Sequence, residues 1–145
     1  MKKIISILIL ILIVGCNPKK EDIKFGTFDL YNNDTLRGTI YRMNNFQIEK
    51  YSDNSELIAQ IDYETDSTYL INGIEKNQIG IDSIIWLNKY KEVEKNKFKI
   101  IVTPYNSEIE YRFDGILIKT NEQIEKKYID TLNYLNENYK KFNEK

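Results

Sequence analysis

The chain has no histidine, one cysteine, two prolines and no excess of charge of either sign. Without histidine, neither a Ser-His-Asp nor a Cys-His catalytic arrangement can form, and the ordinary zinc sites are excluded as well. The 21 Lys and Arg residues balance the 22 Asp and Glu residues, for a net charge of −1, so the chain carries no electrostatic footprint for nucleic acid. We therefore expect no nucleic-acid partner, no metal site and no cofactor.

The glycines and carboxylates give little support for an enzyme. The six glycines form no phosphate-binding loop and no dinucleotide fingerprint. The alternating carboxylates of "DYETDS" (62–67) have the spacing that opens a calcium loop, but the positions that an EF-hand fills with Gly and Glu hold Ser and Gly. Glu49, Glu108 and Glu110 are candidate carboxylates for acid–base glycoside hydrolysis, yet the sequence places no two of them across a cleft. We expect a protein that is not an enzyme.

The single cysteine, Cys16, ends an apolar run near the start of the chain. Two lysines precede this run (4–14), which is shorter than the about 20 apolar residues of a membrane-spanning helix. Its last residues, "IVGC", resemble the lipobox of bacterial lipoproteins, in which a lipid such as palmitate is attached to the cysteine and the peptide is cut just before it. We predict a signal peptide over 1–15 and a lipidated cysteine with a polar tether over 16–24. The alternatives are a plain signal peptide and an anchor helix with an incidental cysteine.

Between residues 25 and 119, short β-prone runs alternate with turn residues, a pattern typical of all-β proteins. Pairs such as those at 44–45, 72–73 and 114–115 tolerate the positive φ of two-residue turns, and such short connections allow only antiparallel neighbours. We predict an antiparallel meander curled into an open or closed lipocalin-like barrel, because closure removes exposed edges. The β-prone runs are 26–31, 35–43, 46–52, 57–64, 68–71, 81–93, 98–104, 107–113 and 116–119.

Beyond residue 119 the apolar period changes from two residues to three or four. Thr120 and Gln123 have the spacing of a capping box, which starts a helix. We predict an amphipathic helix within 120–145 that packs on the β domain (25–119), or alternatively docks a partner. Its apolar stripe would consist of Ile124, Tyr128, Leu132, Leu135, Tyr139 and Phe142.

A two-residue turn at 44–45 would set the register of the hairpin around it. Tyr41 would then pair with Ile48, and Met43 with Phe46, on one apolar face.

The opposite face of this hairpin would pair Arg42 with Gln47 and Ile40 with Glu49, with Arg42 in diagonal reach of Glu49. Such a set can be an exposed ladder that keeps the hairpin soluble. It can also be a polar lining inside a curled sheet, where the planar guanidinium recognises a carboxylate or phosphate. Arg42, Gln47 and Glu49 are therefore the candidate polar binding face.

Four stretches carry a resemblance to a known family: "GTF" (26–28), "IYRMNNFQIE" (40–49), "IDYETDSTYL" (61–70) and "FKIIVTPYNSEIEYRF" (98–113). In these the chain is similar to a family of small flavobacterial, Bacteroidetes-type lipoproteins of unknown function. Some members carry an inherited "DNA topoisomerase IV" label, which nothing in such a short secreted chain supports. The chain departs from the family in an enlarged segment (73–95) and in its long C-terminal helix. The resemblance implies a fold and an envelope location, but no activity.

Together these features predict a lipid-anchored protein of the cell envelope, at the outer membrane on its periplasmic or surface side. We expect a non-catalytic binding or envelope-interaction module, attached to the membrane through lipidated Cys16 and binding an unknown protein or small-molecule ligand. The alternatives are a lipocalin-like carrier of a small apolar ligand and an immunity or inhibitor lipoprotein.

Overall fold

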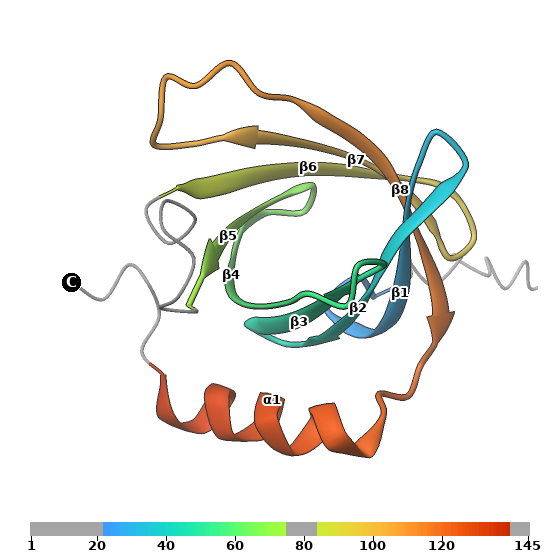
Figure 1. Cartoon of the computed structure of the whole chain (residues 1–145), viewed down its shortest axis with the longest axis vertical. Coiled ribbons are helices and arrows are strands. Elements are labelled where there is room, and N and C mark those ends of the chain that lie inside the picture. Colours follow the sequence, from blue (N-terminus) through green and yellow to red (C-terminus); the bar gives the residue numbers. More distant parts are fainter. Residues whose placement is uncertain (1–21, 75–83, 140–145) are drawn as a thin grey trace, which may run out of the picture.

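The computed structural model describes residues 22–74 and 84–139, which form a closed eight-stranded β-barrel with one helix on its outer wall (Figure 1). Each strand pairs antiparallel with its neighbours in chain order, and β1 pairs with β8 to close the barrel. The predicted meander with a C-terminal helix is therefore confirmed, in its closed form. The predicted signal peptide (1–15) and Cys16 lie outside the described residues. The elements are β1 (Phe25–Asn32), β2 (Thr35–Met43), β3 (Phe46–Tyr51), β4 (Glu56–Thr65), β5 (Thr68–Gly73), β6 (Ile85–Glu94), β7 (Lys97–Pro104), β8 (Phe113–Asn121) and α1 (Lys126–Asn138).

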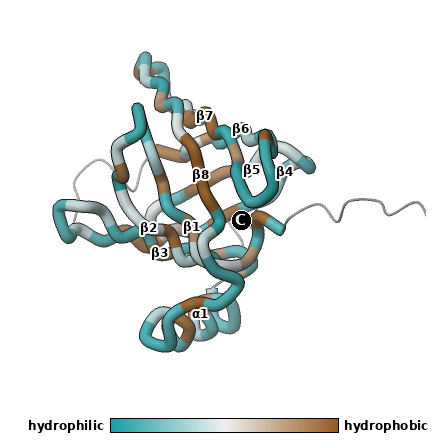
Figure 2. The backbone as a smooth tube through the Cα atoms, turned by 90° about the vertical axis from the view of Figure 1, so that its right-hand side faces the viewer, coloured by the Kyte–Doolittle hydropathy of each residue, from teal (hydrophilic) through white to brown (hydrophobic). Residues whose placement is uncertain are grey.

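Side chains alternate between the inside and the outside of the barrel, as the period of two requires. Figure 2 shows the apolar stretch of β8 and the hydrophilic turns between strands. Two apolar clusters result, one inside the barrel and one between its outer wall and α1. The buried members of the inner cluster are Ile23, Phe28, Leu30, Ile40, Ala59, Ile61, Tyr69, Ile71, Phe98, Ile100 and Leu117.

The hairpin of β2 and β3 has the predicted register: Tyr41 pairs with Ile48 and Met43 with Phe46. This apolar face points out of the barrel and is covered by α1, where the rings of Tyr41 and Tyr128 stack at 4.0 Å. The helix thus covers an apolar sheet face on the outside of the barrel. This burial stabilises the fold by about 25 cal/mol for each Å² of apolar surface removed from water.

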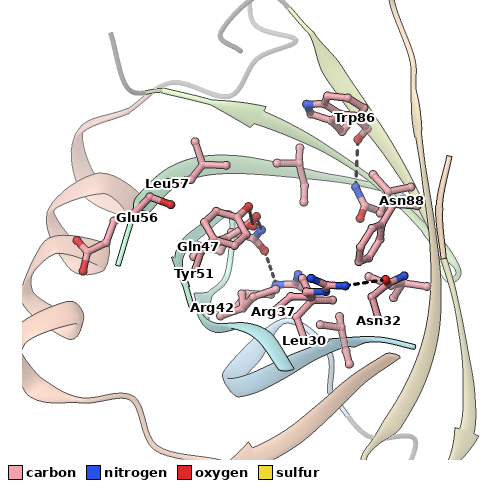
Figure 3. A pocket seen from close by; sticks show the side chains of 18 of the residues that line it. Leu30, Asn32, Arg37, Arg42, Gln47, Tyr51, Glu56, Leu57, Trp86 and Asn88 are labelled. Atoms are coloured by element: carbon pink, nitrogen blue, oxygen red, sulfur yellow. Dashed lines mark hydrogen bonds between the residues drawn. The ribbon is translucent and has the colours of Figure 1, made fainter. Parts of the chain in front are cut away.

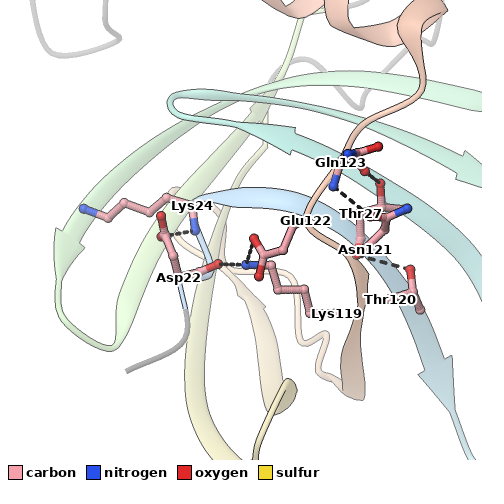
Figure 4. Close-up of polar contacts among 8 residues, drawn as sticks. All are labelled: Asp22, Lys24, Thr27, Lys119, Thr120, Asn121, Glu122 and Gln123. Atoms are coloured by element: carbon pink, nitrogen blue, oxygen red, sulfur yellow. Dashed lines mark hydrogen bonds and ion pairs between the residues drawn. The ribbon is translucent and has the colours of Figure 1, made fainter. Parts of the chain in front are cut away.

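The helix begins at Lys126, later than the predicted capping box at Thr120 and Gln123. Thr120 and Asn121 instead extend β8, where Asn121 pairs with Thr27. The side chain of Thr27 donates to the carbonyl of Gln123 over 2.8 Å, so these residues hold the strand end to β1 (Figure 4). The capping box was wrong because both of its residues have tertiary partners. Of the predicted stripe, Phe142 lies outside the described residues.

The predicted strand over 107–113 and the turn after it were also wrong. Residues 105–112 form an irregular connection, and Asp114 and Gly115 lie within β8. A Cβ at Gly115 would lie 2.5 Å from the ring of Phe113 and 3.1 Å from the carbonyl oxygen of Tyr31. Glycine is needed here for close packing inside the barrel, and not for a turn.

The other Gly-containing pair that suggested a turn, Asn72-Gly73, lies at the end of β5. Asn72 pairs with Gln60 and Gly73 with Ala59 across the sheet. The neighbouring strand therefore holds this pair in extended backbone.

Candidate functional site

A cavity of about 610 Å³ opens at one end of the barrel, which we call the mouth (Figure 3). The mouth lies where β1 and β3 end and β6 and β8 begin. The volume is within the range of about 300–1,000 Å³ that is usual for small-molecule sites, and barrel mouths are a common place for them.

The wall of the cavity is mainly apolar and aromatic. Trp86, the single tryptophan of the chain, lies at its rim and meets the ring of Tyr111 edge-on, with ring centres 5.4 Å apart. The apolar residues of the wall are Leu30, Ile40, Leu57, Ile71, Ile100, Val102, Phe113 and Leu117.

The opposite end of the barrel, which we call the floor, is closed by the segment just before β1. Ile23 inserts into the inner cluster and is 3% exposed. The ammonium of Lys119, which points into the barrel, donates to the carbonyl oxygen of Asp22 over 3.0 Å and pairs with Glu122 at 2.9 Å (Figure 4). The backbone N–H of Asn44 donates to the carbonyl of Lys24 over 2.9 Å.

Arg42 lies between floor and cavity and is fully buried. Its Nε donates to Oε1 of Gln47 over 2.8 Å, its Nη1 to the carbonyl of Ile23 over 3.1 Å, and its Nη2 to the hydroxyl of Tyr69 over 3.2 Å. The guanidinium also lies over the rings of Tyr69 and Phe28, at 4.8 Å and 5.4 Å from their centres. A buried guanidinium needs hydrogen-bond acceptors of this kind, because an unpaired buried charge is very costly.

From Arg42 a chain of hydrogen bonds runs toward the mouth. Gln47 accepts from Arg42 and donates through Nε2 to Oε1 of Glu49, while the hydroxyl of Tyr51 donates to Oε2 of Glu49. Arg42 was expected to reach Glu49 directly across the hairpin. The amide of Gln47 instead lies between the two charges and connects them. The candidate polar face is thus inside the barrel, with Gln47 fully buried and Glu49 8% exposed. We call Arg42, Gln47, Glu49 and Tyr51 the polar chain.

Burial raises the pKa of Glu49 above its ordinary value. The hydrogen bonds from Tyr51 and Gln47 and the charge of Arg42 lower this pKa in part, but do not offset the loss of water. Burial and the neighbouring carboxylate of Glu49 likewise raise the pKa of Tyr51, so its hydroxyl keeps its proton at neutral pH. Tyr51 therefore remains a donor to Glu49.

The other sequence candidates do not join this site. Glu108 and Glu110 are exposed in the connection before β8 and do not line the cavity, so the structure does not bring either of them to Glu49. Within 22–74 and 84–139, no group of three or more His, Cys, Asp or Glu residues could hold a metal ion. In the same ranges, no helix has the length and apolar character needed to cross a bilayer.

Tyr51, Trp86 and Asn88 are among the cavity residues that the sequence reasoning missed. Tyr51 continues the alternation of Gln47 and Glu49 by one further step, so the period of two could have revealed it. Asn88 is 2% exposed and donates from Nδ2 to the carbonyl of Trp86 over 3.2 Å. Asn88 and Trp86 lie on β6, which pairs with its chain neighbours β5 and β7, and neither residue was distinguished from the rest of that strand by its sequence.

Fold and site together define a closed β-barrel with an apolar cavity and a buried polar chain at its base. No protein-family model, no curated protein and no solved structure matches this chain.

Proposed function

We propose that this chain is a non-catalytic binding module that takes a small amphipathic molecule into the mouth of its barrel. The observation that carries this proposal is an apolar cavity of about 610 Å³ with the polar chain at its base. Apolar walls supply binding energy by burying ligand surface, and a few placed polar groups orient the ligand.

Trp86 offers a direct test, because it is the single tryptophan and lies at the cavity rim. A chain starting at residue 17 retains every residue that closes the barrel. Titrated with the neutral probe N-phenylnaphthylamine, it should show energy transfer from Trp86 to bound probe.

Two matched variants on β7 test whether the probe binds inside the cavity. Val102 lines the cavity, whereas Ile101 is the next residue and points to the outer side. Val102→Phe should weaken probe binding about tenfold or more, and Ile101→Phe should leave it within about twofold, where tenfold corresponds to about 1.4 kcal/mol. Binding that both variants weaken equally, or no energy transfer at all, would contradict the proposal.

We also propose that the barrel is anchored by a lipid on Cys16, as in the lipoproteins that the sequence resembles. Lys119 holds the carbonyl of Asp22 at the floor, opposite the mouth. The stretch from Cys16 to Asp22 spans at most about 20 Å when fully extended, so the anchor would keep the floor near the membrane and leave the mouth facing away. Fatty-acid labelling of the wild type and of Cys16→Ala tests the anchor: equal label in both would overturn it.

A protein partner at the mouth is the second candidate, as for an immunity or inhibitor lipoprotein. Tyr105 and Ile109, on the connection between β7 and β8, are 60% and 57% exposed. This role predicts a toxin or hydrolase gene next to that of this chain. Ile109→Ser would then abolish inhibition of that product while leaving probe binding unchanged.

A further inference from the structure

The polar chain has a direction, and that direction specifies the chemistry of the ligand. This inference rests on the proposed function, because it concerns the head group of the molecule in the same cavity. Arg42 is fully buried behind Gln47, whereas Glu49 retains 8% of its surface. Both ends of the polar chain line the cavity, but the cationic end is the more deeply buried and the anionic end is the more accessible.

The hydrogen bonds maintain this direction. Oε1 of Gln47 accepts from Arg42, so its Nε2 has to point to Glu49. The hydroxyl of Tyr51 also donates its hydrogen bond to Glu49. When Glu49 is ionised, the oxygens left facing a ligand, on Glu49 and Tyr51, can accept hydrogen bonds but have no proton to give.

The charges of the lining favour a cation as well. Three carboxylates, of Glu49, Asp53 and Glu56, line the cavity against two guanidinium groups, of Arg37 and Arg42. Burial raises the pKa of Glu49 although Tyr51, Gln47 and Arg42 lower it, so the protein compensates this charge only in part, and a bound cation would complete that compensation.

The rim adds aromatic faces. Trp86 and Tyr111 meet edge-on at the mouth, and Tyr51 lines the cavity beside Glu49. Tryptophan and tyrosine rings attract cations through their faces.

We propose that the cavity binds a small apolar amine, with its ammonium group on the carboxylate of Glu49 and its apolar body against the wall of the barrel. Binding is non-covalent. A fatty acid of equal length is disfavoured, because its carboxylate would meet Glu49 and find no donor there.

Three ligands of equal chain length test this head-group preference: dodecylamine, dodecanol and dodecanoate. They are titrated into the chain from residue 17 at neutral pH, with Trp86 fluorescence as the readout; the amine and dodecanoate are kept below their micelle concentrations and dodecanol below its solubility limit. The wild type should bind the amine about tenfold or more tightly than dodecanoate, as expected for a hydrogen bond to a charged group, with the alcohol between them.

Two matched variants, each replacing a carboxylate by an amide, complete the test. Glu49→Gln should weaken amine binding about tenfold and leave alcohol binding within about threefold. Glu56→Gln, at an exposed residue of the same lining, should change neither by more than about threefold.

The outcomes separate the two proposals. If none of the three ligands binds the wild type, the proposed function itself fails. If the alcohol binds but dodecanoate binds as tightly as the amine, or if Glu49→Gln keeps the amine preference, this inference fails and cavity binding stands. Circular dichroism verifies that each variant is folded, and the wild-type series alone decides the preference should Glu49→Gln not fold.

Discussion

Replacing the buried Arg42 by methionine should lower the free energy of unfolding by about 3–5 kcal/mol, the usual cost of breaking a buried charge pair. Methionine fills much of the same volume, so packing changes little. The change removes three hydrogen bonds, which end on Gln47, the carbonyl of Ile23 and Tyr69. It also leaves Glu49 as a buried carboxylate without a nearby cation.

The matched control is Arg37→Met on the same strand. Arg37 is exposed, and the hydrogen bond from its Nη2 to Oδ1 of Asn32 is long at 3.4 Å. Surface changes of this kind cost about 0.5 kcal/mol or less. Urea unfolding curves followed by the fluorescence of Trp86 measure both variants on the same scale.

A second variant separates lost charge compensation from lost packing. If the cost of Arg42→Met comes from the charge left on Glu49, then Arg42→Met/Glu49→Gln should be more stable than Arg42→Met alone, by about 1 kcal/mol or more. The reasoning is refuted by a loss below about 1 kcal/mol in Arg42→Met, the ceiling for exposed pairs. It is refuted equally by a double variant that is no more stable than the single one.

The remaining predictions concern the titration of Glu49, the floor and one close backbone contact. Because burial raises the pKa of Glu49 above the about 4.3 of an unfolded glutamate, its contribution favours folding at low pH and is lost as the pH rises from about 4.3 through the raised pKa. The stability of the wild type relative to Glu49→Gln should therefore fall in urea unfolding as the pH rises above about 4.3, and a rise would contradict the assignment. Ile23→Ala should cost about 2–5 kcal/mol in the same assay, because it opens a hole in the floor, and a loss below about 1 kcal/mol would show that the floor collapses without it. Gly26→Ala should lower the free energy of unfolding by about 1–3 kcal/mol, because Gly26 has a φ of 125° and a Cβ there would lie 2.7 Å from the carbonyl oxygen of Asn121. An unchanged melting temperature would mean that β1 and β8 can shift apart.

The sequence was sufficient for the meander and for the register of its clearest hairpin. Two asparagines at 44–45 define a short turn, Asn44 has the positive φ of 53° that such a turn needs, and the pairing of Arg42 with Gln47 follows from the turn by counting. Local chemistry decides these features, so they can be derived from local sequence.

Which face of that hairpin lies inside the barrel could not be derived in this way. Tyr41 and Met43 form the more apolar face, and the usual pattern would place them in the core. They are buried by α1, on the outside, while Arg42 is turned inward. The choice depends on a helix more than 80 residues away in the chain, whose Tyr128 stacks on Tyr41.

The turn at 114–115 and the capping box failed for a related reason. Gly115 is a residue type that favours turns, and Thr120 is one that favours helix starts. Both nevertheless lie in β8, the strand that closes the barrel against β1. Barrel closure joins the two ends of the sheet, so the pairing of β8 with β1 overrides local preference. β1 and β8 lie at opposite ends of the barrel sequence, so no short stretch of sequence contains both strands.

We expect an apolar barrel of the same shape to be at least as stable as one that contains the polar chain. Buried ion pairs replaced as a unit by apolar residues are often neutral or stabilising by about 1–4 kcal/mol, because no charge remains to be desolvated. The free energy of unfolding of the triple variant Arg42→Met/Gln47→Leu/Glu49→Leu should therefore be no more than about 1 kcal/mol below that of the wild type. It should be well above that of Arg42→Met alone.

The same triple variant should lose its preference for dodecylamine and still bind dodecanol, because the apolar wall of the cavity is unchanged. Urea unfolding and Trp86 fluorescence on one preparation measure the two properties together. A triple variant as unstable as Arg42→Met would mean that the polar chain holds the barrel in shape, and its charges would then need no ligand to explain them. A stable variant that no longer distinguishes amine from carboxylate would mean the opposite: the chain keeps a buried carboxylate at a cost in folding because that carboxylate faces a ligand.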